Sequence, residues 1–221
     1  MKAVLFDFNG TLSDDEELLR EIFGALLAER GLELDPSMYY ERLAGLPDPE
    51  IVERIFELLI PGSSGEERAA FLAEKVARYK RAIELRPRIG PDETAAVERA
   101  ARAARLGVVT GALREEVQYA LDLAGIAGRF EVLVAIDDGH PGKPNPAGFL
   151  AALERLNDTP GAEPIEPSQV LVIEDSRAGV EAAKAAGMKC AVIDGPAYAG
   201  AAVAADAVID RLDADAIAGL L

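Results

Sequence analysis

The sequence predicts an α/β fold: a doubly wound parallel sheet, Rossmann-like in its core, with an inserted α-helical cap domain. Three observations predict this fold. Short apolar runs rich in strand-forming residues alternate with helical patterns through most of the chain, as in parallel α/β sheets. The runs are continuously apolar, as expected for strands buried on both faces. One long stretch after the first run contains helical patterns only, which indicates an insertion.

The expected strands are the short apolar runs, most of them closed by polar or turn-forming residues. They cover Ala3–Phe6, Leu106–Thr110, Val132–Ile136, Val170–Ile173, Ala191–Ile193 and Ala207–Ile209. The helices expected between them cover Asp92–Arg105, Arg114–Leu123, Ala147–Leu156 and Arg177–Ala186. Gly187 follows the last of these helices and suits a helix C-cap.

The helix-only stretch lies between the first and second expected strands. Its helices cover Asp15–Arg30, Pro36–Ala44, Pro49–Leu59 and Glu66–Glu84, with glycine and proline between them. Four helices that interrupt a strand–helix alternation indicate a cap inserted over the sheet. We therefore expect residues 14–86 to form a helical cap domain, and residues 1–13 with 87–221 to form the α/β core domain.

The composition argues against two classes of partner. The chain has 221 residues, of which 50% are hydrophobic, and a formal net charge of −16. This charge argues against nucleic acid and anionic membranes as partners, because both require clustered positive charge. We expect a monomer or a homodimer.

Cysteine usage and the N-terminus indicate a cytoplasmic protein. Cys190 is the single cysteine, so no intrachain disulfide can form, as is usual in a reducing compartment. The N-terminus has no basic start followed by a long apolar run, so we expect no signal peptide. No stretch approaches the roughly 18 uninterrupted apolar residues of a membrane-spanning helix.

Functional residues are expected directly after the strands, because ligands of open α/β sheets bind at the carboxyl ends of the strands. The residues at these positions are Asp7, Thr110, Asp137 or Asp138, and Glu174 with Asp175. Taken alone, each has an ordinary structural explanation, such as a turn residue or a helix cap.

Three features of the sequence suit phosphate chemistry. A carboxylate such as Asp7 can act as a covalent nucleophile. Lys143 lies in the stiff sequence Pro141-Gly142-Lys143-Pro144, where it can supply a fixed positive charge beside a nucleophile. The adjacent carboxylates of Glu174 and Asp175 suit Mg²⁺, which prefers one or two carboxylates, waters and substrate phosphate.

The order and spacing of the motifs resemble the haloacid dehalogenase superfamily over nearly the whole chain. The motifs are Asp7-x-x-Gly-Thr-Leu, Thr110 after the second strand, Gly-Lys143-Pro, and Glu174-Asp-Ser-x-x-Gly. The cap resembles that of the β-phosphoglucomutase and phosphoglycolate phosphatase relatives. The resemblance implies a magnesium-dependent phosphoric monoester hydrolase that acts on a small phosphorylated metabolite.

The resemblance also implies a role for each matching residue. Asp7 would attack phosphorus and become an aspartyl phosphate, while Thr110 and the Gly111 amide would bind the phosphoryl oxygens. Lys143 would hold Asp7 and the phosphoryl group. The magnesium ligands would be Asp7, the backbone carbonyl of Asn9, Glu174 and Asp175. In the cap, Arg42 and Gly45 would lie in the loop that contacts the distal part of the substrate.

Asn9 departs from the family pattern. Phosphatases of this superfamily usually carry a second aspartate there, which protonates the leaving oxygen and then activates water. A carboxamide cannot transfer a proton near neutral pH, and loss of an acid–base group typically costs about 10²–10⁴-fold in rate. With Asn9 at this catalytic position, we expect turnover that is weakened, limited to certain substrates, or altered by an introduced substitution.

Several explanations of Asn9 remain open. The leaving group can be one that needs little protonation, as in an acyl phosphate. His140 can supply the proton, although a solvated loop histidine is the simpler interpretation. Asn9 can also be an introduced replacement of aspartate, or it can deamidate, since it precedes Gly10.

Other functions compete with a phosphatase. A 2-haloacid dehalogenase of this fold needs no magnesium and no acid at position 9, but it leaves Glu174 and Asp175 unexplained. A phosphonoacetaldehyde hydrolase uses a cap lysine, which residues 42–50 lack. A mutase normally needs the missing acid–base group as well. A catalytically impaired phosphate-binding or regulatory protein is the alternative from a different class.

Overall fold

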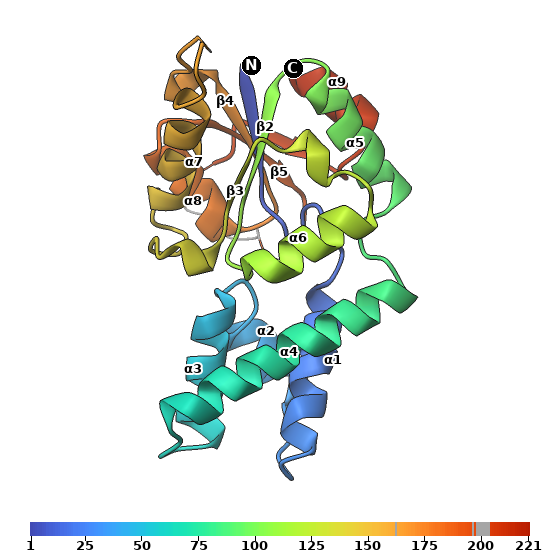
Figure 1. The fold of residues 1–221 in the computed structure, drawn as a ribbon, viewed down its shortest axis with the longest axis vertical. Helices are drawn as coiled ribbons and strands as arrows, with labels where there is room; N and C mark the ends of the chain where they lie inside the picture. Colours follow the sequence, from blue (N-terminus) through green and yellow to red (C-terminus); the bar gives the residue numbers. More distant parts are fainter. Residues whose placement is uncertain (162, 196, 198–203) are drawn as a thin grey trace.

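The computed structural model describes residues 1–161, 163–195, 197 and 204–221. Within these residues, the centre is a six-stranded parallel sheet in the order β3-β2-β1-β4-β5-β6 (Figure 1). The strands are β1 (Ala3–Phe6), β2 (Arg105–Val109), β3 (Val132–Val134), β4 (Val170–Glu174), β5 (Lys189–Ile193) and β6 (Ala207–Ile209). The predicted α/β fold is confirmed. Because β1 lies between β2 and β4, residues that follow these three strands meet at one edge.

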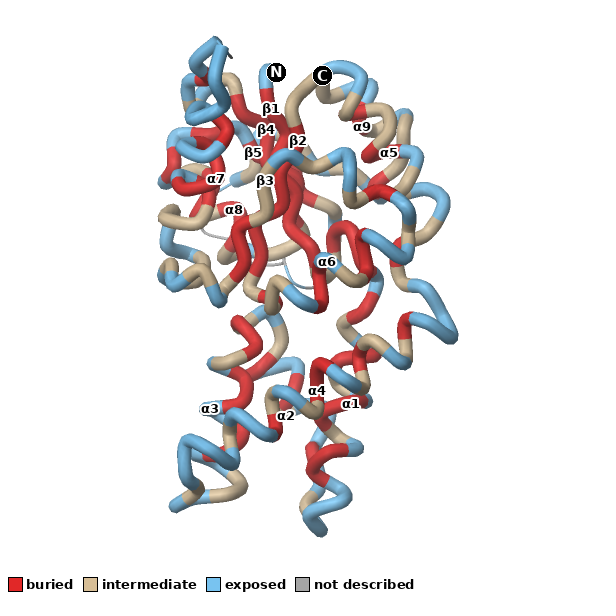
Figure 2. The backbone as a smooth tube through the Cα atoms, viewed as in Figure 1, coloured by how far each residue is buried: buried red, intermediate tan, exposed pale blue. Residues whose placement is uncertain are grey.

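Helices cover both faces of the sheet. On one face lie α7 (Ala147–Asn157) and α8 (Arg177–Ala185), and on the other lie α5 (Pro91–Ala101), α6 (Arg114–Leu123) and α9 (Ala214–Leu220). Along β1, Ala3 and Leu5 join the apolar cluster under α7 and α8, while Val4 and Phe6 join the cluster that continues into α5, α6 and the cap. The central strands β1 and β4 are therefore buried on both faces (Figure 2).

The structure differs from the expected elements in a few places. The third strand ends at Val134 and is followed by a 3₁₀ turn, Ile136–Asp138, instead of continuing to Ile136. Helix α5 ends at Ala101, before the expected Arg105. Helix α9 was not expected, because its seven residues are short for a recognisable helical period. Two further 3₁₀ turns are Ala127–Arg129 and Pro167–Gln169.

The cap consists of four helices between β1 and α5. They are α1 (Glu16–Ala28), α2 (Pro36–Arg42), α3 (Asp48–Leu59) and α4 (Gly65–Leu85). Phe71 of α4 stacks on Phe23 of α1 and meets Phe56 of α3 edge-on, with ring centroids 6.2 and 5.2 Å apart, so one aromatic cluster joins three helices. We propose that residues 14–86 are the cap domain and that residues 1–13 and 87–221 are the core domain.

The cap covers the carboxyl end of the sheet, and both chain termini lie at the opposite end of the core (Figure 1). The two parts touch at the start of α3, where the backbone N–H of Asp48 donates to the Gly111 carbonyl over 3.1 Å. A Cβ added at Gly111 would lie 3.2 Å from Pro47 Cα. The cap loop therefore rests against the residues that follow β2.

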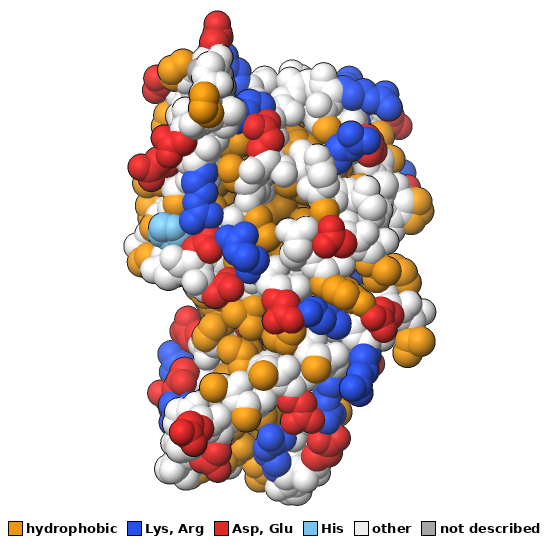
Figure 3. All heavy atoms as spheres, in the orientation of Figure 1, with side chains coloured by type: hydrophobic (Ala, Val, Ile, Leu, Met, Phe, Trp, Pro, Cys, Tyr) orange, Lys and Arg blue, Asp and Glu red, His pale blue; other side chains and the backbone are white. Residues whose placement is uncertain are grey.

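Charged side chains are distributed over the surface rather than gathered by sign. On the face shown in Figure 3, acidic and basic side chains alternate, and apolar side chains gather in the part of the cap next to the core. In the described part of the chain, none of the helices combines the length and the apolar character that a membrane crossing requires.

Candidate active site

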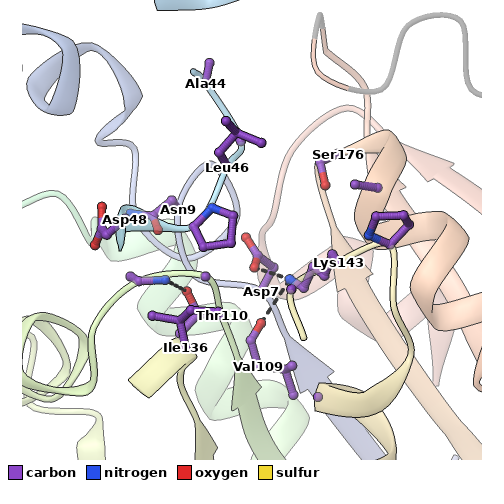
Figure 4. A pocket seen from close by; sticks show the side chains of 18 of the residues that line it. Asp7, Asn9, Ala44, Leu46, Asp48, Val109, Thr110, Ile136, Lys143 and Ser176 are labelled. Atoms are coloured by element: carbon purple, nitrogen blue, oxygen red, sulfur yellow. Dashed lines mark hydrogen bonds and ion pairs between the residues drawn. The ribbon is translucent and has the colours of Figure 1, made fainter. Parts of the chain in front are cut away.

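Asp7 lies at the centre of the sheet edge, directly after β1. Its backbone N–H donates to the Ile173 carbonyl of β4 over 2.9 Å, which continues the strand pairing to the position of the carboxylate. The Asp7 side chain forms an ion pair with Lys143 Nζ (Figure 4). Burial raises the pKa of Asp7 to about 7; the Lys143 ammonium opposes this shift and the Glu174 carboxylate adds to it.

Lys143 places one positive charge between the strand ends. Its Nζ also donates to Glu174 Oε1 over 2.6 Å and to the Val109 carbonyl over 3.0 Å. Burial acts to lower the pKa of this ammonium group, but the carboxylates of Asp7 and Glu174 raise it above its usual value. The raised pKa favours the charged form of Lys143.

Glu174 is fully buried and has hydrogen bonds to both carboxylate oxygens. Oε1 accepts from Lys143, and Oε2 accepts from the backbone N–H groups of Asp175 and Ser176 and from the Ser176 hydroxyl. A Cβ at Gly179 would lie 1.8 Å from the Glu174 carboxyl carbon. The carboxylate thus lies over the first turn of α8, where backbone N–H groups favour negative charge.

Asp175 turns toward the loop that follows Asp7. A Cβ at Gly10, whose φ is +75°, would lie 2.1 Å from Asp175 Oδ2, so only glycine leaves room for this carboxylate. One oxygen each from Asp7, Glu174 and Asp175 lie within 4.8 Å of one another. The pKa of Asp175 is raised to about 8, chiefly by burial and in addition by the negative charges of Asp7 and Glu174.

Thr110 and Gly111 form the second side of the site. Thr110 directly follows β2, and its Oγ1 accepts a hydrogen bond from the Ala112 N–H over 3.0 Å. The threonine hydroxyl hydrogen remains available for a ligand, because this bond uses the oxygen as an acceptor. Both residues line the pocket with Asp7 and Lys143.

Asn9 is tied to the start of the cap. Its Nδ2 donates to both carboxylate oxygens of Asp15, each over 3.1 Å. Asp15 also accepts from the Tyr79 hydroxyl over 2.6 Å and is fully buried. Burial raises the pKa of Asp15 above its usual range. The amide of Asn9 is therefore held by a carboxylate six residues further along the chain.

A cavity of about 890 Å³ lies between the cap and the sheet edge. It brings together most of the residues that sequence reasoning selected: Asp7, Asn9, Gly45, Thr110, Gly111, His140, Lys143 and Asp175. Glu174 is buried behind Lys143 rather than in the cavity wall. Arg42 is exposed at the end of α2 and does not line the cavity.

The acidic residues after β3 have structural partners. Asp138 forms ion pairs with Arg114 and Arg155, and Asp137 accepts from the Arg114 backbone N–H. Neither lines the cavity. The sequence predicted a functional residue at Asp137 or Asp138. In the structure, both aspartates instead connect α6 or α7 to the loop that follows β3.

Sequence reasoning missed several cap residues in the cavity wall, among them Glu16, Tyr39 and Asp48. Glu16 and Asp48 begin helices, where acidic residues are common for electrostatic reasons alone. Tyr39 lies four residues before the apolar Leu43, a helical spacing that predicts burial rather than a site. The sequence contains no signal that separates these residues from ordinary cap residues.

Comparisons with known proteins identify the family of the chain. The family model of haloacid dehalogenase-like hydrolases matches residues 1–187. Validoxylamine A 7'-phosphate phosphatase of Streptomyces hygroscopicus subsp. limoneus is 32% identical over 192 residues, covering 86% of this chain and 84% of the relative. The phosphorylated carbohydrates phosphatase of Thermotoga maritima is 30% identical over 190 residues, covering 86% and 83%.

A solved structure is similar over almost the full length. It is an aspartate-to-asparagine mutant of CbbY from Rhodobacter sphaeroides in complex with xylulose-(1,5)bisphosphate, with a TM-score of 0.83 and 27% identity, covering 96% of this chain and 95% of that one. The parallel sheet with its inserted helices, the ordered motifs at its carboxyl edge and the match over residues 1–187 lead to one conclusion. The chain is an enzyme that belongs to the haloacid dehalogenase-like hydrolase family.

Proposed function

We propose that this enzyme is a magnesium-dependent phosphatase of small phosphorylated metabolites that works through an aspartyl-phosphate intermediate at Asp7. The observation that carries the proposal is the position of Asp7, which is paired with Lys143 and faces Asp175 at the floor of the cavity. A nucleophilic carboxylate, a fixed cation and a second carboxylate suited to a metal are the parts that phosphoryl transfer requires.

The residues fit a divalent cation. Asp7 and Asp175 are buried carboxyl groups with raised pKa values, about 7 and about 8, and a cation would offset their mutual repulsion. We propose the carboxylates of Asp7 and Asp175 and the backbone carbonyl of Asn9 as ligands. Glu174 completes the predicted set, but both its oxygens already accept hydrogen bonds. Its main role in this proposal is to hold Lys143 and the start of α8.

In the proposed reaction, one Asp7 oxygen attacks phosphorus while the bond from phosphorus to the leaving oxygen breaks. Thr110 and the Gly111 N–H hold the phosphoryl oxygens, and Lys143 neutralises charge on Asp7 and the phosphoryl group. Mg²⁺, when bound, would lower the repulsion between the anionic nucleophile and the anionic substrate. Water then attacks phosphorus of the intermediate and releases phosphate from Asp7.

Asn9 affects both halves of this reaction. The leaving oxygen receives no proton from a carboxamide, and the attacking water loses no proton to it. Substrates with a stable leaving anion avoid the first difficulty but not the second. We therefore expect phosphorylation of Asp7 to be faster than hydrolysis of the intermediate when the leaving group is acidic.

p-Nitrophenyl phosphate tests this proposal, because nitrophenolate leaves without protonation. With Mg²⁺ we expect a burst of nitrophenolate equal to the enzyme concentration and then slow turnover, since accumulation of a covalent intermediate produces a burst. Asn9→Asp should remove the burst and raise steady turnover by about 10²–10⁴-fold. Asp7→Asn should release no nitrophenolate.

The outcomes also separate a phosphatase from an impaired binding protein. Slow turnover in the unsubstituted chain and fast turnover in Asn9→Asp would indicate a silenced catalyst. Turnover in both, abolished by Asp7→Asn, supports a phosphatase with selected substrates. Absence of phosphate release from both, over a panel of phosphorylated metabolites with Mg²⁺, contradicts the proposed function.

A further inference from the structure

The cap wall of the cavity carries negative and polar groups but no basic side chain. Within residues 14–86, all of which the structure describes, no lysine, arginine or histidine lines the cavity. The cap residues that do so are Glu16, Leu19, Tyr39, Tyr40, Ala44, Gly45, Leu46, Pro47, Asp48 and Ile51. The basic lining residues all come from the core. They are Lys143, which pairs with Asp7 and Glu174, Arg177, which pairs with Glu181, and His140.

Three polar atoms on this wall lack a hydrogen-bond partner among the described residues. They are Glu16 Oε1, the Tyr39 hydroxyl and Asp48 Oδ2. Tyr39 is 0% exposed and Asp48 is 4% exposed. A buried polar atom without a partner is destabilising, and such atoms in a cavity wall are expected where a ligand supplies the missing bond.

These three residues form one cluster. Burial raises the pKa of Glu16 above its usual value. Burial, the negative charge of Glu16, a hydrogen-bonding interaction with Glu16 and the negative charge of Asp48 raise the pKa of Tyr39. The electrostatic influence of the two carboxylates on one hydroxyl places all three groups around the same part of the cavity.

Lys75 of α4 compensates only part of this cluster. It is buried and lies 2.8 Å from Asp48 Oδ1 and 2.7 Å from Glu116 Oε2. Burial raises the pKa of Glu116 to about 8, so the Lys75 charge is matched chiefly by Asp48, and Glu16 has no basic partner of its own in the cavity wall. An anionic ligand beside Glu16 would therefore face like charge, which disfavours binding in a desolvated site.

We propose that Glu16, Tyr39 and Asp48 form a subsite for the leaving group of the substrate, and that this group is a hydroxyl- or ammonium-bearing alcohol without a second negative charge. This inference rests on the proposed phosphatase function. The carboxylate oxygens accept hydrogen bonds from the hydroxyl or ammonium groups, and the Tyr39 hydroxyl donates or accepts one.

The size and the apolar part of the cavity agree with such a group. A volume of about 890 Å³ exceeds the need of a phosphate alone and lies within the range of small-ligand sites. Leu19, Leu46 and Ile51 supply apolar surface beside the polar cluster, suited to the C–H faces of a sugar or cyclitol ring. The substrate class is thus a phosphate monoester of a polyol or amino polyol, not a bisphosphate or phosphorylated acid.

Three substrates of similar size and one simple substrate test the inference. Glucose 6-phosphate and glucosamine 6-phosphate lack a second anion, 6-phosphogluconate adds a carboxylate, and p-nitrophenyl phosphate lacks polyol hydroxyls. We expect kcat/KM for the first two to exceed that of 6-phosphogluconate by about tenfold or more. The measurements use the unsubstituted chain and Asn9→Asp, and calorimetric Kd values with Asp7→Asn replace rates that are too slow.

Two variants locate the preference in the subsite. Tyr39→Phe removes a hydroxyl that has no partner, so Tm should stay unchanged or rise, while KM for the sugar phosphates should rise about fivefold or more, the equivalent of one hydrogen bond. Glu16→Gln should weaken glucosamine 6-phosphate more than glucose 6-phosphate. Both should change kcat/KM for p-nitrophenyl phosphate, which lacks polyol hydroxyls, less than kcat/KM for the sugar phosphates. Glu21→Gln, at an exposed position of the same helix, is the matched control and should change nothing.

The results separate this inference from the proposed function. Equal or better use of 6-phosphogluconate, or sugar phosphate KM values unchanged in both Tyr39→Phe and Glu16→Gln, would overturn the subsite while p-nitrophenyl phosphate is still hydrolysed. If Asp7-dependent phosphate release fails for every substrate, the phosphatase function is wrong. In that case, Kd values that rank 6-phosphogluconate last still support the subsite as a binding site, and values that rank it equal or first reject it.

Discussion

The hydrogen bond between Asn9 and Asp15 determines how a carboxylate would lie at position 9. In Asn9→Asp, two carboxylates would stand where an amide now donates to Asp15 over 3.1 Å. Two carboxyl groups at this distance do not both ionise, so one holds a proton or turns away. The Asp15 carboxylate therefore disfavours an ionised carboxylate at position 9.

Exchanging the two residues should correct this. In the double variant Asn9→Asp/Asp15→Asn, an amide at position 15 can donate to the new carboxylate at position 9. We expect kcat of the double variant to exceed that of Asn9→Asp by about tenfold, within the range of acid–base contributions. Steady-state kinetics with p-nitrophenyl phosphate measures this. A double variant slower than Asn9→Asp would show that Asp15 itself contributes to the reaction.

Single residues could be predicted where strand order alone determines their position. Asp7, Thr110 and Asp175 follow adjacent parallel strands, so they meet whatever the side-chain packing is. Arg42 and Glu16 depend on the orientation of cap helices over the sheet, which no local pattern specifies. The prediction therefore selected Arg42, which is exposed, and missed Glu16, which lines the cavity.

At the element scale, the Glu174 carboxylate lies at the junction of β4 and α8, in space that is open only because Gly179 has no side chain. A Cβ there would lie 1.8–2.2 Å from the Glu174 carboxyl atoms. Gly179→Ala should therefore displace this carboxylate and with it Lys143, at a cost of about 1–3 kcal/mol in stability and with a lower kcat. Gly219→Ala in α9, where no atom lies within 4 Å of the new Cβ, is the control. It should leave kcat unchanged and stabilise slightly, by less than about 1 kcal/mol. Equal effects of both substitutions on kcat and chemical denaturation would contradict this explanation.

Two lysines of α4 join the cap to α6 of the core in different surroundings. Lys75 is buried between Asp48 and Glu116, with side chains 1–5% exposed. Lys80 pairs with Glu115, whose side chain is 68% exposed. Lys75→Met would leave the buried carboxyl groups of Asp48 and Glu116 without their cation. We expect it to lower the free energy of unfolding by roughly 3 kcal/mol and to raise KM by loosening the cap.

Lys80→Met is the control and should change stability by less than about 1 kcal/mol. Denaturant unfolding and hydrogen exchange of residues 44–48 measure both, and similar losses from both variants would argue against a buried cap–core link.

The elements themselves were largely predictable, for a physical reason. Parallel strands such as β1 and β4 are buried on both faces, so their apolar runs stand out against the helices. The ends of α5 and β3 and the short helix α9 were not, because packing against neighbours rather than local pattern decides them.

At the scale of the whole molecule, buried carboxyl groups link stability to pH and to metal. Asp7, Asp175 and Glu116 have pKa values of about 7, 8 and 8, raised chiefly by burial, whereas the same groups in an unfolded chain titrate near pH 4. Between about pH 4 and pH 8 the folded chain therefore binds more protons than the unfolded chain, so stability falls as pH rises through this range. The net charge of −16 acts in the same direction, but it depends on ionic strength rather than on a particular cation.

Mg²⁺ should reverse part of this dependence. Without metal, we expect Tm to fall from about pH 5.5 to about pH 8.5. Protons compete with a cation for Asp7 and Asp175, so Mg²⁺ should raise Tm more at the higher pH than at the lower. A Mg²⁺ concentration 100-fold above Kd stabilises the folded chain by about 2.7 kcal/mol, which raises Tm by roughly 5–10 °C for a chain of this size.

Scanning fluorimetry with Mg²⁺, and with NaCl at equal ionic strength, separates metal binding from charge screening. Asp175→Asn should show a shallower pH dependence and a smaller Mg²⁺ shift, because it removes one titrating ligand. A Tm that rises with pH in the absence of metal, or a Mg²⁺ shift that is equal at both pH values and unchanged in Asp175→Asn, would place the metal away from Asp7 and Asp175.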